Sequence, residues 1–211
     1  SHTTLGFDRV LQEGYGGLRK RIEERLARGG FENQYAAPAY LAEDSPGKVF
    51  RTSGNAAHWA SAAPRAEYDT PPLTVECRAR INSKDGFNVL VLNRNKDSSR
   101  HWEIYSYAGT GCFSAYLPGY APAEVKSGRF IADGQWHHLA MTFDGVRVAL
   151  FVDGEQVASE AVQAKEAPDA GEGALYFGAY PPHSIGCDGA IAEVRISNAI
   201  RDIAPGGAPL E

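Results

Sequence analysis

Polar and aromatic side chains alternate along one stretch of the sequence in a way that suits contact with sugars. Residues 101–107 read HWEIYSY, so every second position is polar or a tyrosine: His101, Glu103, Tyr105 and Tyr107. Successive side chains of a β-strand point to opposite faces, so these four would share one face. Aromatic rings stack on the apolar faces of sugar rings, and polar groups hydrogen-bond to their hydroxyls. Because Trp102 and Ile104 form the more apolar face, we expect that face to enter the core and the other to meet a ligand.

Further residues suited to sugar binding fall in predicted loops: Arg94, Asn95, Tyr120, Tyr180 and His183. We expect them to form a rim around the binding face. The alternative is that the tyrosines only fill the interior of the fold, since an aromatic content of 10% is unremarkable.

Catalysis by the same residues would need a second acid. Glycoside hydrolysis requires two carboxylates about 5–5.5 Å apart for retention or about 6.5–9.5 Å apart for inversion. Glu103 is the first candidate, but positions 101, 105 and 107 carry no acidic residue. Glu193 has Arg195 two positions further on, which predicts an ion pair on a solvated sheet face. We therefore lean towards a chain without catalytic residues. A carboxylate from a distant strand that pairs with Glu103 is the alternative.

Other catalytic motifs and two classes of partner are not supported. The sequence has no His-Glu-x-x-His, Gly-x-Ser-x-Gly or phosphate-binding glycine motif. A net charge of −5 argues against a nucleic-acid binder, which needs a basic face. No apolar run approaches the roughly 18–20 residues that span a bilayer, so we expect no membrane insertion. Cys77, Cys112 and Cys187 are widely spaced and do not form a zinc pattern.

The elements that must position these residues are mostly strands. The chain contains 23 Gly and 12 Pro, a surplus that indicates many turns and an all-β domain. Residues 74–81 alternate apolar and polar, with Cys77 on the apolar face. Three further strands are separated by Asp144-Gly145 and Asp153-Gly154, which are typical of hairpin turns.

One stretch near the amino terminus predicts a helix. Leu18, Ile22 and Leu26 recur every four residues among charged side chains, and Gly29-Gly30 follows. We expect a short helical arm, residues 1–33, packed on a domain of residues 34–211. The alternative is a piece of a neighbouring domain or a helix that docks a partner.

Three segments in the second half of the chain resemble the laminin-G-like family. They are DGQWHHLAMTFDG (133–145), VALFVDGEQV (148–157) and CDGAIAEVRISNAIRD (187–202). This family belongs to the concanavalin A-like lectins and glucanases. The resemblance implies a jelly-roll sandwich of two antiparallel sheets, about 12–14 strands in all, and its hollow sheet face is where relatives place glycans.

The resemblance also implies a function. It suggests a non-catalytic carbohydrate-binding, lectin-like module whose partner is a glycan or polysaccharide. Such a module would belong to a larger secreted or cell-surface protein and pack against its other domains. The alternatives are a glycoside hydrolase or polysaccharide lyase with Glu103 as the first catalytic candidate, or a domain that only binds proteins or acts as a scaffold.

Calcium is the one cofactor that the resemblance implies. Relatives often hold a structural calcium ion beside the last strand, with a residue placed like Asp188 as a ligand. However, the acidic residue common in the family's first core strand is missing here, where the sequence reads RTSGNAAHW (51–59). The alternative is that Asp188-Gly189 is a turn before a strand.

Overall fold

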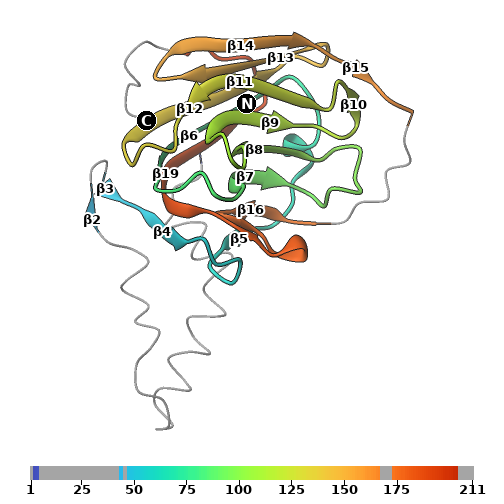
Figure 1. The fold of residues 1–211 in the computed structure, drawn as a ribbon. Helices are drawn as coiled ribbons and strands as arrows, with labels where there is room; N and C mark the ends of the chain where they lie inside the picture. Colours follow the sequence, from blue (N-terminus) through green and yellow to red (C-terminus); the bar gives the residue numbers. More distant parts are fainter. Residues whose placement is uncertain (1, 5–42, 45–46, 167–172, 204–211) are drawn as a thin grey trace, which may run out of the picture.

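The computed structural model describes residues 2–4, 43–44, 47–166 and 173–203, which form an all-β sandwich of antiparallel sheets (Figure 1). The helix expected within residues 1–33 lies outside the described residues, so the helical arm and its boundary stay predictions. In the described part of the chain, no helix has the length and hydropathy needed to cross a bilayer.

Two large sheets make the layers of the sandwich. One sheet has the order β1 (His2–Thr4), β19 (Asp188–Ser197), β6 (Leu73–Ile81), β12 (Trp136–Phe143), β13 (Arg147–Val152) and β14 (Glu155–Ala161), with β4 (Phe50–Ser53) also paired to β19. The second sheet has the order β11 (Glu124–Phe130), β9 (Cys112–Tyr116), β8 (Trp102–Ser106), β7 (Asn88–Asn93), β16 (Leu175–Phe177) and β5 (Ala60–Ala62). These seven-stranded and six-stranded sheets together match the 12–14 strands that the resemblance implies.

Short elements complete the described residues. Three two-stranded ribbons pair β2 (Glu43–Asp44) with β3 (Gly47–Lys48), β10 (Tyr120–Ala121) with β15 (Gln163–Ala164), and β17 (Ala179–Tyr180) with β18 (Ile185–Gly186). Two 3₁₀ helices, η3 (Ala66–Tyr68) and η4 (Pro181–His183), lie in loops.

The core lies between the two sheets and follows the predicted alternation. On β6, Val75 and Cys77 are fully buried within it, and Cys77 is a free thiol. On β8, Trp102 and Ile104 belong to the same core, while Glu103 and Tyr105 do not. The prediction that Trp102 and Ile104 point inward is therefore confirmed. Each such buried side chain contributes about 1.5–3 kcal/mol to folding.

The meander β12–β13–β14 forms where the sequence predicts it. Its second turn has positive φ at both Asp153 (53°) and Gly154 (83°), as expected for this kind of hairpin. In the first turn only Gly145 has a positive φ. Here Asp144 Oδ1 instead accepts hydrogen bonds from the backbone N–H groups of Val146 and Arg147.

The apolar run of β7 is buried on both faces. The pairing with β8 shifts register between Val89 and Val91, so Leu90 and Val91 enter the core while Val89 and Leu92 face outward. Val89 and Leu92 then pack with Tyr180 and Ile185 of the β17–β18 ribbon. This ribbon therefore covers part of the outer face of the six-stranded sheet and becomes one wall of the site described below.

The expected ion pair between Glu193 and Arg195 is wrong. The pairing of β19 with β6 shifts register between Ala192 and Arg195, and Glu193 has a φ of 48°. This bulge separates the two side chains. Arg195 instead makes two hydrogen bonds of 2.8 Å to Glu76, and both side chains are buried rather than solvated. Glu193 lies 4.0 Å from Arg78.

Candidate functional site

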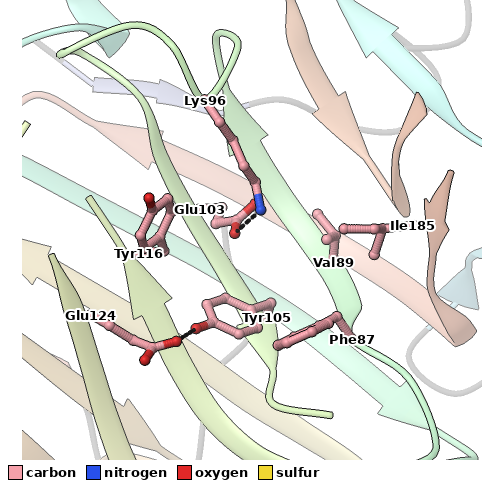
Figure 2. Close-up of a pocket in the computed structure, with 8 residues that line it drawn as sticks. All are labelled: Phe87, Val89, Lys96, Glu103, Tyr105, Tyr116, Glu124 and Ile185. Atoms are coloured by element: carbon pink, nitrogen blue, oxygen red, sulfur yellow. Dashed lines mark hydrogen bonds and ion pairs between the residues drawn. The ribbon is translucent and has the colours of Figure 1, made fainter. Parts of the chain in front are cut away.

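A cavity of about 180 Å³ opens on the outer face of the six-stranded sheet (Figure 2). Its walls come from six separate parts of the chain, and eight side chains line it: Phe87, Val89, Lys96, Glu103, Tyr105, Tyr116, Glu124 and Ile185. Glu103 and Tyr105 come from β8 at the centre, while β9 and β11 supply the side opposite to Val89 and Ile185. The strand that the sequence singled out therefore lies on the floor of this cavity.

Glu103 is a buried carboxylate that the protein itself compensates. Only 3% of the residue is exposed, and its Oε1 lies 2.8 Å from Lys96 Nζ (Figure 2). On its other side, Oε2 lies 3.6 Å from Nε2 of the buried His101. Burial by itself would raise the pKa of Glu103, but His101 and Lys96 outweigh it and hold this pKa below its ordinary value. The group is therefore ionised at neutral pH.

Tyr105 and Glu124 form the second polar contact of the cavity. The Tyr105 hydroxyl donates a hydrogen bond of 2.5 Å to Glu124 Oε1. Glu124 Oε2 lies 2.8 Å from Lys126 Nζ, and this ammonium lies 3.8 Å from the centre of the Tyr107 ring. Burial, together with the charge of Glu124, raises the pKa of the Tyr105 phenol well above its usual range. Tyr105 therefore stays a hydrogen-bond donor.

Aromatic rings surround the opening. Phe87 is 38% exposed, and its ring lies 5.9 Å from that of Tyr105 and 5.2 Å from that of Tyr107. Tyr116 stands on the opposite side, with Lys96 Nζ 5.4 Å from its ring centre. Phe87 is the exposed ring of the lining, Tyr116 is half-buried and Tyr105 is buried on the floor. Accessible rings beside hydrogen-bonding groups are the combination that sugar rings require.

The sequence found only part of this set. Of the predicted residues, Glu103 and Tyr105 line the cavity, His101 lies behind Glu103, and Tyr107 contacts Phe87. Sequence reasoning missed the other six lining residues: Phe87, Val89, Lys96, Tyr116, Glu124 and Ile185. Strand pairing places Tyr116 opposite both Glu103 and Glu124, a register that no local pattern predicts.

Within the described residues, none of the five predicted rim residues lines the cavity. Tyr180 is buried, accepts the Lys96 backbone N–H, and stacks on the exposed His183 at 4.9 Å between ring centres. Asn95 Oδ1 is buried, and no group in the described part of the chain forms a hydrogen bond with it. The remaining two are Arg94 and Tyr120.

Those two rim residues serve the structure of the fold. Arg94 makes hydrogen bonds of 2.8 and 2.6 Å to Asp69. Tyr120 packs against Phe143 of the core, with ring centres 4.8 Å apart. Tyr120 therefore packs against the interior of the fold, as the alternative interpretation of the tyrosines predicts.

Asp188, the residue considered as a metal ligand, is the first residue of β19 rather than part of a turn before it. Its Oδ1 accepts a hydrogen bond of 3.3 Å from the Asn82 side chain, and its backbone N–H donates to Asn88 Oδ1. Among the described residues, no group of three or more His, Cys, Asp or Glu side chains is arranged to hold a metal ion.

A second carboxylate from a distant strand does accompany Glu103, because Glu124 lines the same cavity. Both carboxylates are ion-paired with lysines at 2.8 Å. A general acid for glycoside hydrolysis needs a raised pKa, whereas the pKa of Glu103 is lowered. The arrangement therefore suits hydrogen bonding to a ligand better than proton transfer.

The fold and the sequence assign the chain to a family. Residues 53–202 match Laminin_G_3, described as the concanavalin A-like lectin/glucanases superfamily. The chain therefore belongs to this family. No curated protein sequence matches the chain.

Solved structures of the same fold include sugar-binding and extracellular domains. Domain 4 of AbnA, a GH43 extracellular arabinanase from Geobacillus stearothermophilus solved with arabinotriose, matches with a TM-score of 0.52 and 17% identity over 75% of this chain and 74% of that one. The CBM40 domain of the Ruminococcus gnavus IT-sialidase bound to α2,3-sialyllactose matches with a TM-score of 0.50 and 15% identity over 61% and 76%. The LG1-3 region of the laminin α2 chain matches with a TM-score of 0.51 and 13% identity over 71% of this chain and 26% of that one. At these identities the likeness establishes the fold.

Proposed function

We propose that this domain is a non-catalytic carbohydrate-binding module that holds a sugar in the cavity on the outer face of the six-stranded sheet. The observation that carries the proposal is that the aromatic side chains of Phe87, Tyr105 and Tyr116 line one cavity together with hydrogen-bonding groups. Stacking on the rings would supply most of the affinity, and Glu124, Lys96 and Tyr105 would orient the hydroxyls. Shallow sites of this kind bind with millimolar to micromolar dissociation constants, roughly −4 to −8 kcal/mol.

Relatives with the same fold support this proposal. The arabinanase domain was solved with arabinotriose, and the sialidase domain with sialyllactose. Both are domains of larger enzymes that act on glycans. By the same analogy, we propose that this chain serves a larger secreted or cell-surface protein and brings it to a glycan.

A pair of exposed phenylalanines provides a matched test. Phe87 lines the cavity, whereas Phe130 on β11 is exposed to a similar extent, 45%, but does not line it. The purified protein is first screened against a glycan and polysaccharide array, and hits are titrated by calorimetry. We expect Phe87→Ala to weaken binding about fivefold, since an aromatic contact is worth about 0.5–1.5 kcal/mol. Phe130→Ala should bind like the wild type.

The same array gives the contrary outcomes. Absence of binding to every glycan would contradict the proposal. Equal losses of affinity in Phe87→Ala and Phe130→Ala would show that the cavity is not the binding site. A calcium requirement, proposed from the family resemblance, is tested by repeating the array with EDTA and then with added calcium. Binding that EDTA leaves unchanged would argue against a calcium ion at the site.

A second candidate function follows from the two carboxylates in one cavity. If Glu103 and Glu124 acted on a glycosidic bond, the protein would be a glycoside hydrolase or a lyase. Incubating the array hits with the protein and analysing reducing ends tests this candidate. Product formation that Glu103→Gln abolishes, while binding persists, would favour the enzyme over the binding module.

A further inference from the structure

The charges around the cavity restrict the class of sugar it can accept. Three charged side chains line it, namely Glu103, Glu124 and Lys96. Two of the three are acids, and each of these carboxylates already has a lysine partner, Lys96 for Glu103 and Lys126 for Glu124. A carboxylate on a ligand would meet two fixed carboxylates, and such like-charge contacts cost several kcal/mol.

The nearby cations are already engaged. Lys96 Nζ lies 2.8 Å from Glu103 and above two aromatic rings, 5.4 Å from the centre of Tyr116 and 5.2 Å from that of Tyr180. Lys126 Nζ lies 2.8 Å from Glu124. An acidic sugar would have to detach one of these ammonium groups from its carboxylate, at the cost of leaving that carboxylate uncompensated.

Arginine, which suits planar anions best, does not contribute to the lining. A guanidinium binds a carboxylate through two parallel hydrogen bonds. Within the described residues, none of the eight side chains that line the cavity is an arginine. Arg94, predicted from the sequence as a rim residue, directs its guanidinium to Asp69 instead.

The pKa values of Tyr105 and Tyr116, the two tyrosines that line the cavity, are raised by burial and by the nearby carboxylates. Burial raises the pKa of Tyr116, and the charges of Glu103 and Glu124 raise it further. Burial and Glu124, with a smaller contribution from Glu103, do the same to Tyr105. Burial is the larger cause of these raised pKa values, and the smaller part that comes from Glu103 and Glu124 is a repulsion that a bound anion would also meet.

A cationic sugar is disfavoured by the same contacts. The buried Glu103 already has Lys96 on one oxygen and His101 on the other side. An amino sugar would therefore compete with the Lys96 ammonium for this carboxylate and gain no uncompensated one.

We propose that the cavity binds one uncharged sugar residue and rejects its uronic-acid, sialic-acid and amino-sugar counterparts. The cavity of about 180 Å³ is smaller than the ~300–1,000 Å³ typical of sites for drug-sized ligands, which suits a single ring. This inference rests on the proposed function, because it names the class of sugar for the same site.

Sugars matched in stereochemistry test the inference. The probes are glucose, glucuronic acid and glucosamine, the same three forms of galactose, and lactose beside sialyllactose. Binding to the full chain is followed by NMR shifts of backbone amides in β8 and β9, and dissociation constants are compared within each set. We expect the neutral member of a set to bind at least tenfold more tightly than its charged members.

A charge-neutralising variant provides the second readout. Glu124→Gln removes one negative charge from the cavity, and Glu160→Gln removes one from the exposed face of β14. We expect Glu124→Gln to reduce the ratio of the dissociation constants of acidic and neutral sugars about fivefold, and Glu160→Gln to leave this ratio unchanged.

Each remaining result overturns a distinct statement. Equal or tighter binding of the acidic member, with shifts in the same strands, would overturn the inference and leave the binding module intact. Tighter binding of the amino sugar would do the same. If no probe binds here and no glycan binds on the array, the proposed function fails as a whole.

Discussion

The Tyr105 hydroxyl donates a hydrogen bond to Glu124 Oε1 across 2.5 Å, and this contact joins β8 to β11 although β9 lies between them. Both side chains stand on the outer face of the sheet, and Figure 2 shows them at one end of the cavity. A hydrogen bond to a charged acceptor contributes about 1.5–3 kcal/mol. The contact therefore positions a ring that lines the cavity and also ties the edge strand β11 to the central strand β8.

Replacing Tyr105 by phenylalanine should separate these two roles. Tyr105→Phe keeps the ring but leaves Glu124 with Lys126 alone, so we expect a loss of about 1–2 kcal/mol in the free energy of unfolding. Urea unfolding of Tyr105→Phe, Glu124→Gln and the double variant measures the coupling. Strictly additive losses would show that the contact contributes nothing to stability.

Lys96 should stabilise the buried carboxylate of Glu103 inside the cavity. Lys96→Met removes the ammonium 2.8 Å from a buried carboxylate, so we expect a destabilisation of about 2 kcal/mol, less than the ~3–5 kcal/mol of a fully buried pair because Lys96 is partly exposed. Adding Glu103→Gln should recover part of this loss. Thermal unfolding of the four proteins tests the pair, and a double variant less stable than Lys96→Met would contradict the prediction.

The buried ion pair of Glu76 and Arg195 in the seven-stranded sheet should make the fold sensitive to acid. Burial opposes the charge of Glu76, but His138 and Arg195 outweigh it and hold its pKa below the ordinary value of 4.5. Protons therefore bind the unfolded chain more readily than the folded one, and stability falls as the pH drops from about 4.5 through the lower folded pKa.

Urea unfolding between pH 3 and pH 7 measures this dependence. Asp69 and Glu103 also have lowered pKa values and contribute to the wild-type slope. Glu76→Gln should therefore reduce the slope without abolishing it, while the exposed Glu160→Gln leaves it unchanged. If stability falls with pH equally steeply in Glu76→Gln and the wild type, Glu76 does not contribute to the acid sensitivity.

A glycine in the last strand should tolerate no side chain. A Cβ at Gly189 would lie 2.0 Å from the carbonyl oxygen of Arg80 on β6, whereas one at Gly86 would meet nothing within 4 Å. We expect Gly189→Ala to destabilise the protein by about 3 kcal/mol and Gly86→Ala to change stability by less than about 0.5 kcal/mol. Melting curves of the two variants compare them, and equal melting temperatures would contradict the close packing of β19 on β6.

The positions of the main strands and the two faces of β8 could be predicted from the sequence. The alternation of residues 101–107 correctly placed Trp102 and Ile104 in the core. Residues 133–157 and 187–202 carried enough family pattern to indicate the concanavalin A-like fold, which the match over residues 53–202 confirms. The direction of a side chain on a strand depends only on the local backbone, so a single strand contains the information.

The partners of those side chains were decided by the tertiary structure. Lys96 comes from a loop, Tyr116 and Glu124 from two further strands, and Ile185 from a ribbon some 80 residues away from β8. The bulge at Glu193 moved Arg195 to Glu76, against the expected i+2 pair. Register and bulges arise from the packing of whole sheets, and neither is a property of one segment. The sequence by itself therefore determined which face of β8 would be polar, and only the assembled sandwich decided which charges and rings would surround it.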